Sequence, residues 1–405
     1  MRAELNIERL ILLLLIASAV SMLGRKLRLP YTVGLVLTGV GLALSPFPLD
    51  ATLTKELIFT AFLPPLIFEA AFQIPWQELR RDLFPILVLA TLGVFLSAGV
   101  TALGLRGIAG WPWQTAILIG VLLAATDPVS VIATFKEAGI TGRLRLLVEA
   151  ESLFNDGTAA VLFGVALAAT QGNSVTAWGV AQSFLVTVAG GVACGALIGG
   201  AALLLAGRTD DHLVEITFTM IAAYGSFLLA EHFHLSGVLA TLTAGLLLGN
   251  LGSLGALTDR GRAEVLSFWE YIAFLVNSLI FLLIGIRLAH HPFGSVLLPA
   301  LAAILLVLLG RAIAVYGCCA LFVRSRWRVT AAQQHILFWG GLRGALALAL
   351  ALGLPGTMTE RETLITVTFA VVAFSVIVQG LTVIPLLKRL RQIAPAEAPG
   401  SRSSC

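Results

Sequence analysis

Long apolar runs separated by short polar connections fill this chain from end to end. A helix that crosses a bilayer needs about 20 mainly apolar residues, and the strict alternation typical of membrane β-strands is absent. The pattern therefore predicts an all-α polytopic membrane protein with about thirteen transmembrane helices. The predicted spans are residues 5–23, 30–45, 53–73, 83–106, 113–137, 143–169, 176–206, 212–231, 235–250, 267–289, 294–323, 329–353 and 362–387.

Two of these runs contain residues that interrupt a helix. In the fifth run Pro128 follows Asp127, and proline lacks a backbone donor and disfavours helix at the preceding residue. In the twelfth run the glycines of GGLRG surround Arg343. A broken helix in lipid frees backbone polar groups, which is tolerated only beside protein or a water-filled cavity. Both breaks are therefore expected to face a cavity.

The positions of the two breaks suggest an internal repeat. Residues 5–169 and 212–387 each contain six predicted spans, and a helix at 176–206 links them. The interrupted helix is then the fifth span of each half. Paired interrupted helices are typical of transporters built from inverted repeats, with the binding site near the middle of the membrane.

The composition supports a membrane location. Hydrophobic residues make up 58% of the chain and charged residues 12%, whereas ordinary soluble domains carry roughly 25% charged residues. The first apolar run lacks a small-residue cleavage site, so a cleaved signal peptide is not expected. The four cysteines form no disulfide pattern. The basic residues are scattered between apolar runs, so nucleic acid is not an expected partner.

The basic residues predict the orientation of the chain. With the C-terminus in the cytoplasm, eighteen Lys and Arg residues fall in cytoplasmic segments and five fall outside. This bias follows the positive-inside rule and places the N-terminus outside. The expected location is the inner membrane of a bacterium. Residues 1–393 would form the transmembrane domain and 394–405 a disordered cytoplasmic tail, with no soluble regulatory domain.

Several ionisable residues lie well inside predicted spans, among them Glu69, Asp127, Glu151, Asp156 and Arg343. Each costs about 2.5–3.5 kcal/mol at the centre of a lipid-facing helix, so these groups are expected to pair or to line a watery cavity. At about 1.5 Å per residue, Asp127 lies roughly 21 Å from the outer end of its span, and Asp156 roughly 18 Å from the inner end of the next. Both carboxylates are therefore expected near the middle of the membrane.

The sixth span gathers oxygen atoms around Asp156. Ser152 precedes Asp156 by four residues and shares its face, while Glu151 and Asn155 share the neighbouring face. The break near Thr126 is expected to free backbone carbonyls in the adjacent span. Because hard cations take oxygen ligands, this arrangement favours a site for a small cation.

Three ordered motifs carry a resemblance to a known family. TDPVSV at 126–131, ESLFNDG at 151–157 and GGLRGALALALAL at 340–352 resemble sodium/proton antiporters of the NhaP and sodium/hydrogen-exchanger type. The resemblance covers most of the chain. It implies two inverted six-helix repeats, crossed unwound helices in a core domain, and a separate dimerisation domain that forms a homodimer in the lipid bilayer. Sodium and protons would be transported, and no cofactor is expected.

The same resemblance assigns roles to individual residues. It places binding of sodium and protons at Asp156, Asp127, Ser152 and the backbone of Thr126, with Glu69 nearby through water.

Two further roles follow from the resemblance. Asn155 is similar to the neutral partner of electroneutral members, where electrogenic relatives carry a second aspartate. Glu151 is expected to pair with Arg343 and to hold the sixth and twelfth spans together. Arg311, central in the eleventh span, also needs a partner, which the sequence does not identify.

The predicted activity is exchange of a monovalent cation for a proton by alternating access. Asp156 would hold either a proton or a cation, so that a one-to-one cycle moves no net charge. Sodium, lithium and potassium are all compatible, and a potassium/proton antiporter is an alternative. A cation channel is another alternative, but a channel would need a continuous pore, whereas the paired repeats favour alternating access. An intramembrane aspartyl protease is a further alternative, because such enzymes also use two aspartates within the membrane. They resemble one another in a Gly-x-Gly-Asp motif, whereas Leu-Phe-Asn precedes Asp156 here.

Overall fold

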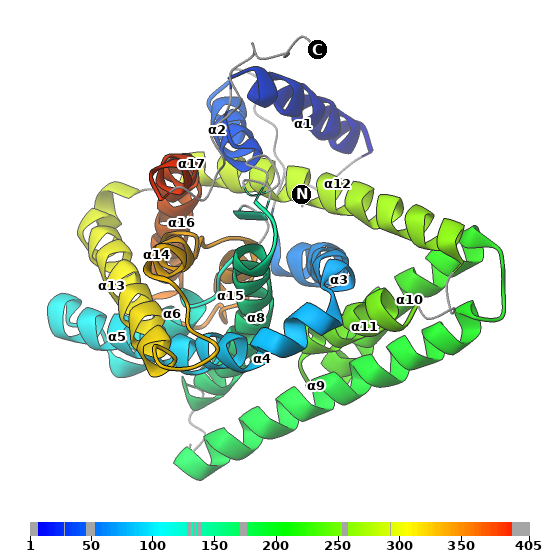
Figure 1. Ribbon diagram of the computed structural model, residues 1–405. Helices are drawn as coiled ribbons and strands as arrows, with labels where there is room; N and C mark the ends of the chain where they lie inside the picture. The colour runs from blue at the N-terminus through cyan, green and yellow to red at the C-terminus, as the bar shows by residue number, and fades with distance from the viewer. Residues whose placement is uncertain are drawn as a thin grey trace, which may run out of the picture.

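The computed structural model describes residues 7–27, 29–45, 53–127, 131–132, 135, 140–170, 176–252, 258–291 and 293–390. Within these residues all regular structure is helical, which confirms the predicted all-α class (Figure 1). The helices are α1 (Ile7–Leu27), α2 (Tyr31–Ala43), η1 (Leu57–Phe62), α3 (Leu63–Gln73), α4 (Trp76–Ala90), α5 (Leu92–Ala109), α6 (Trp113–Leu122), α8 (Arg143–Thr170), α9 (Ala177–Ala206), α10 (His212–His232), α11 (Gly237–Leu251), α12 (Asp259–His290), η3 (Phe293–Val296), α13 (Leu297–Leu321), α14 (Ala331–Trp339), α15 (Ala345–Leu352), α16 (Arg361–Phe374), η4 (Ser375–Gln379) and α17 (Gly380–Arg389).

Many of these helices are suited to a bilayer. Among the described residues, eight helical stretches are long and apolar enough to cross a membrane, which confirms an integral membrane protein. They are Ile7–Gly24, Trp76–Ala109, Arg143–Thr170, Trp178–Ala206, His212–His232, Arg260–His290, Leu297–Leu321 and Arg361–Arg389. Shorter apolar helices cover Tyr31–Ala43, Leu57–Gln73, Trp113–Leu122 and Gly237–Leu251. The number of thirteen crossings stays a prediction. The predicted tail, residues 394–405, lies outside the described residues.

Small residues let helices from the two halves of the chain approach closely. α2 packs along α12, and a Cβ built on Gly39 would lie only 2.9 Å from the Cα of Gly285. α3 packs on α11, where a Cβ on Gly245 would lie 2.8 Å from the Cβ of Ala71. In lipid, such close backbone packing drives helix association, because lipid tails are as apolar as the helices. These crossings therefore join the two halves of the chain.

Both predicted helix breaks are present, and they meet. α6 ends at Leu122, and residues 340–344 separate α14 from α15. The backbone amide of Asp127 donates a hydrogen bond to the carbonyl oxygen of Leu342, with a nitrogen–oxygen distance of 2.7 Å. α15 in turn packs against α6 and α8 (Figure 1). The two interruptions thus satisfy one of each other's free backbone groups, as irregular backbone at membrane depth requires. Pro128, the predicted cause of the first break, lies outside the described residues.

Candidate functional site

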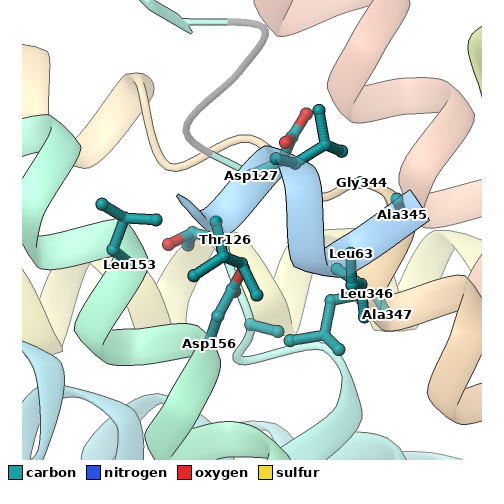
Figure 2. Close-up of a pocket in the computed structure, with 12 residues that line it drawn as sticks. Leu63, Thr126, Asp127, Leu153, Asp156, Gly344, Ala345, Leu346 and Ala347 are labelled. Carbon is teal, nitrogen blue, oxygen red and sulfur yellow. The ribbon is translucent and has the colours of Figure 1, made fainter. Parts of the chain in front are cut away.

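A small cavity lies where the two breaks meet α3 and α8. Its volume is about 30 Å³, which is room for roughly one water molecule or a small ion. Its polar lining residues are Thr126, Asp127 and Asp156 (Figure 2). The other lining residues are Leu63, Leu66, Ile67, Ala125, Leu153, Gly344, Ala345, Leu346 and Ala347. The structure therefore brings three of the predicted site residues together in largely apolar surroundings.

Asp156 enters the cavity from the middle of α8 and is 6% exposed. Its side chain points toward Thr126 (Figure 2), whose backbone donates a hydrogen bond to the carboxyl group. The carboxyl oxygen Oδ1 has no hydrogen-bond partner among the described residues. The side-chain oxygen of the neighbouring Asn155 is also buried without a donor. Two adjacent buried acceptors without donors are costly unless a cation or proton occupies the site.

Ser152 supports the site from behind the cavity. The Oγ1 hydroxyl of Thr126 donates a hydrogen bond to Oγ of Ser152 at 3.1 Å, and both residues are buried. Ser152 does not belong to the cavity lining. It is therefore placed to fix the orientation of Thr126 and, through the Thr126 backbone, the carboxyl group of Asp156.

Glycine is required opposite Asp127. Gly344 lies at the start of α15, and a Cβ built on it would be 2.5 Å from the Cβ of Asp127 and 2.6 Å from its Cγ. No side chain fits at that separation without displacing the aspartate. The break between α14 and α15 thus positions the carboxylate of Asp127, which belongs to the break after α6. Asp127 and Asp156 lie on opposite sides of Thr126 in Figure 2.

The predicted ion pair between Glu151 and Arg343 is wrong, because Glu151 pairs with Arg311. Arg311 Nη1 lies 2.7 Å from Glu151 Oε1, and Nη2 lies 2.9 Å from Oε2. The two residues are 5% and 1% exposed, respectively. This bidentate contact fits the planar guanidinium geometry. It joins α8 to α13 rather than to the break between α14 and α15. It also supplies the partner that the sequence did not identify for Arg311.

Arg343 instead stabilises the broken backbone around it. Its Nε donates to the carbonyl oxygen of Leu123 at 2.9 Å, and its Nη1 donates to the carbonyl oxygen of Gly341. Its own amide donates to Oγ of Ser375 in η4 at 2.8 Å. Leu123 directly follows α6, so the positive guanidinium lies at the negative end of that helix dipole. A charge centred in a run of glycines was the only sequence signal for this role.

Two predicted site residues lie beside the cavity rather than in its lining. Asn155 donates from Nδ2 to Glu151 Oε1 at 3.4 Å, which links the candidate site to the buried ion pair. Glu69 is half-buried on α3 and accepts a hydrogen bond from Gln73 one turn later. Neither belongs to the cavity lining.

The oxygen atoms at the cavity are of the kinds that bind hard cations. Carboxylate, hydroxyl and amide oxygens are ligands for hard cations, and a carboxylate also accepts a proton. The described part of the chain holds no group of three or more His, Cys, Asp or Glu residues arranged for a metal ion. The cavity presents carboxylate and hydroxyl oxygens in the interior of a helical membrane protein.

The model of the family described as "Sodium/hydrogen exchanger, transmembrane" matches residues 11–389, which include every residue of the cavity. The chain belongs to the sodium/hydrogen exchanger family. It is accordingly a secondary transporter rather than an enzyme. The resemblance inferred from the three motifs is confirmed.

Individual relatives of this exchanger cover nearly all of it. The low-affinity Na⁺/H⁺ antiporter NhaS1 of Synechocystis is 40% identical over 395 residues, which are 95% of this chain and 75% of the relative. The Na⁺/H⁺ antiporter NhaH of Halobacillus aidingensis is 33% identical over 397 residues, covering 94% and 97% of the two chains. The structure of the sodium proton antiporter MjNhaP1 from Methanocaldococcus jannaschii matches with a TM-score of 0.76 over 97% of this chain and 98% of that one, at 21% identity. The exchanger therefore shares its fold with MjNhaP1.

Proposed function

We propose that this exchanger trades sodium for protons across a bacterial inner membrane. The observation that carries the proposal is the buried Oδ1 atom of Asp156, which has no donor among the described residues and belongs to a side chain that lines a cavity of about 30 Å³. The relatives named above as Na⁺/H⁺ antiporters support the choice of ions. Lithium and potassium also take oxygen ligands, and a potassium/proton antiporter is the alternative.

Exclusive occupancy of Asp156 couples the two ions. An ionised, empty carboxylate is costly to carry through a dehydrated intermediate, whereas a carboxylate neutralised by a proton or a cation crosses at lower cost. Both occupants need the same carboxyl oxygens, so one displaces the other. Asp127 adds a second negative charge that attracts a cation toward the cavity. Ser152 and Thr126 hold the oxygen geometry.

Reciprocal helix contacts support the proposed inverted repeats. If residues 5–169 and 212–387 are the repeats, α2 and α3 of the first correspond to α11 and α12 of the second. α2 packs on α12, and α3 packs on α11, so exchanging the repeats converts one contact into the other. The contact between α5 and α13 maps onto itself in the same way. This pattern supports two inverted repeats of six spans each, joined by one linking helix. We propose that these repeats provide alternating access to the site where the two helix breaks meet.

Surface exposure and charge support the remaining topology. α1 and α9 are largely exposed along their apolar lengths, which leaves faces for a homodimer and for lipid. The distribution of Lys and Arg supports an outer N-terminus and a cytoplasmic C-terminus. We propose that the cycle moves no net charge, because the neutral Asn155 leaves Asp156 as the one carboxylate that changes its occupant.

Reconstituted vesicles test the proposed activity. The purified protein is placed in liposomes with an acidic interior and a trapped pH dye, and sodium, lithium or potassium chloride is added outside. Sodium is expected to raise the internal pH in a saturable manner. A response to potassium alone would replace sodium with potassium as the substrate. Cation flux that does not saturate and needs no proton counterflow would identify a channel and reject the proposal.

Asn155→Asp is expected to make transport sensitive to membrane potential. A carboxylate at this position adds a second proton-binding group beside Asp156. Two protons would then move in one direction for each cation that moves in the other, so the cycle would transfer net charge. In liposomes under a clamped potential, the variant's rate should change with voltage while the wild-type rate stays constant. A wild-type rate that follows the voltage would contradict the electroneutral cycle.

Gly344→Ala is expected to reduce transport by roughly tenfold or more, because its Cβ would displace the Asp127 carboxylate. Gly41→Ala in α2 is the matched control, since a Cβ there meets no atom within 4 Å. Initial rates in liposomes compare the two variants. Equal rates for both would show that the position of Asp127 does not limit transport.

A further inference from the structure

A second cavity, of about 370 Å³, opens on the surface between α13, α14 and α17, far larger than the ion site. The three helices lie beside one another in Figure 1, and α14 packs on both of the others. Its wall is formed mainly by Tyr316, Phe338, Trp339, Pro385 and Leu386. We call this cavity the α13–α14–α17 groove. Its aromatic and aliphatic lining gives it an apolar wall.

The polar atoms inside the groove are already paired with one another. Nε1 of Trp339 donates to Oγ1 of Thr382 at 2.8 Å, and the hydroxyl of Tyr316 lies 2.7 Å from Nδ1 of His335. The rings of Tyr316 and Phe338 are 5.8 Å apart, within the range of favourable aromatic packing. Away from His335 Nε2 and Arg389, the polar side chains of the groove therefore already have hydrogen-bond partners within it. The wall suits a hydrocarbon chain.

Positive and hydrogen-bond-donating groups lie at the mouth of the groove. Arg389 belongs to the lining, ends α17 and is exposed, and Lys388 precedes it. No ion pair or hydrogen bond of either side chain is present among the described residues. If Tyr316 donates to Nδ1 of His335, the proton of the neutral ring sits on Nε2, which is then a free donor. No acidic residue among those that the structure describes lines the groove. The mouth is complementary to an anion.

The depth of the groove matches the boundary between lipid headgroups and acyl chains. Thr382 and Arg389 are seven residues apart on α17, which is about 10 Å along the helix. Arg389 lies at the end of an apolar stretch long enough to cross the membrane. Aromatic rings and basic side chains are both enriched at such interfaces, where basic pockets between helices bind anionic headgroups.

We infer that the α13–α14–α17 groove binds one anionic phospholipid, with its phosphate at Arg389 and His335 and an acyl chain along Trp339 and Phe338. The site goes beyond the proposed transport activity and uses none of the residues of the ion cavity. The segment after Leu390 is a poorer occupant. Residues 391–405 contain two arginines and one glutamate, so their side chains supply little of the negative charge that a basic mouth attracts.

Native mass spectrometry of the purified full chain tests this site with phosphatidylglycerol and phosphatidylcholine of identical acyl chains. The wild type should bind phosphatidylglycerol in preference to phosphatidylcholine, and added salt should weaken the preference. Arg389→Gln should lower phosphatidylglycerol affinity about fivefold, the effect of removing one basic residue at a membrane surface. Arg208→Gln is the matched control. Arg208, like Arg389, is an exposed arginine near the C-terminal end of a helix, in this case α9, but it does not line the groove. Leu386→Gln should weaken binding through the apolar wall.

Four results would overturn the assignment. They are equal binding of the two lipids, equal losses in Arg389→Gln and Arg208→Gln, displacement of the lipid by millimolar glycerol 1-phosphate, and increased lipid binding after deletion of residues 391–405. Displacement by glycerol 1-phosphate would indicate a simple anion site. Increased binding after the deletion would show that the tail fills the groove. Transport by Arg389→Gln in phosphatidylcholine liposomes should match the wild type in the same lipid, which keeps this test separate from the proposed transport activity.

Discussion

Asp156→Asn is expected to abolish cation-driven proton flux in liposomes. The amide is nearly the same size as the carboxyl group but carries no negative charge, so it binds neither a proton nor a sodium ion in exchange for the other. Because Asp156 is buried with an unpartnered oxygen at the cavity, no neighbouring group in the lining except Asp127 is able to replace its charge. The measurement is the initial rate of dye response after addition of sodium chloride.

Asp211→Asn is the matched control for this variant. Asp211 caps α10 by accepting a hydrogen bond from the amide of Leu213 at 2.9 Å, and an asparagine side chain makes the same cap. Its transport rate and melting temperature should equal those of the wild type. Sodium-driven proton flux in Asp156→Asn at the control rate would refute the assignment of the ion site, although the family and the fold would stand.

Glu151→Gln is expected to destabilise the folded protein strongly. The substitution leaves the buried guanidinium of Arg311 without its carboxylate, and removing one partner of a buried ion pair costs about 3–5 kcal/mol. Thermal unfolding in detergent should show a clear fall in melting temperature relative to the wild type. Little transport activity should survive, since Glu151 also accepts a hydrogen bond from Asn155 beside the ion site.

Two double variants distinguish the observed ion pair from the one expected from the sequence. Glu151→Gln with Arg311→Met removes both buried charges and should recover much of the lost stability. Glu151→Gln with Arg343→Met is the matched control and should be no more stable than the single variant, because Arg343 bonds to the backbone at Leu123 and Gly341. Recovery of stability in the variant with Arg343→Met, and not in the variant with Arg311→Met, would show that Arg343 is the partner of Glu151.

The helix breaks were predictable because their causes are local. A proline lacks a backbone donor wherever it stands, and a run of glycines weakens any helix. The sequence accordingly placed interruptions near Asp127 and Arg343, and both are present. It did not predict that the amide of Asp127 would bond to the carbonyl of Leu342, or that Gly344 would be required by its distance from Asp127. Those contacts join residues more than 200 positions apart.

Arg311 shows where the sequence was insufficient. Its position deep in an apolar run established that it needs a partner, because an unpaired charge there is costly. The resemblance paired Glu151 with Arg343, and finding that Glu151 is instead the partner of Arg311 required the rotation and height of α13 and α15 relative to α8. Each residue turns a helix by about 100°, so a one-residue difference in packing changes which side chains face each other. Hydrophobic patterns fix which helices are buried but leave that register open.

The sequence by itself determined the membrane class, the two breaks and the family, since each depends on residue type and position along the chain. Tertiary structure alone decided that Asp156, Asp127 and Thr126 share one cavity, that Ser152 holds Thr126 from behind, and that Arg311 rather than Arg343 neutralises Glu151. The physical reason is that helices are formed by local bonds. Contacts between them depend on close packing of the whole chain.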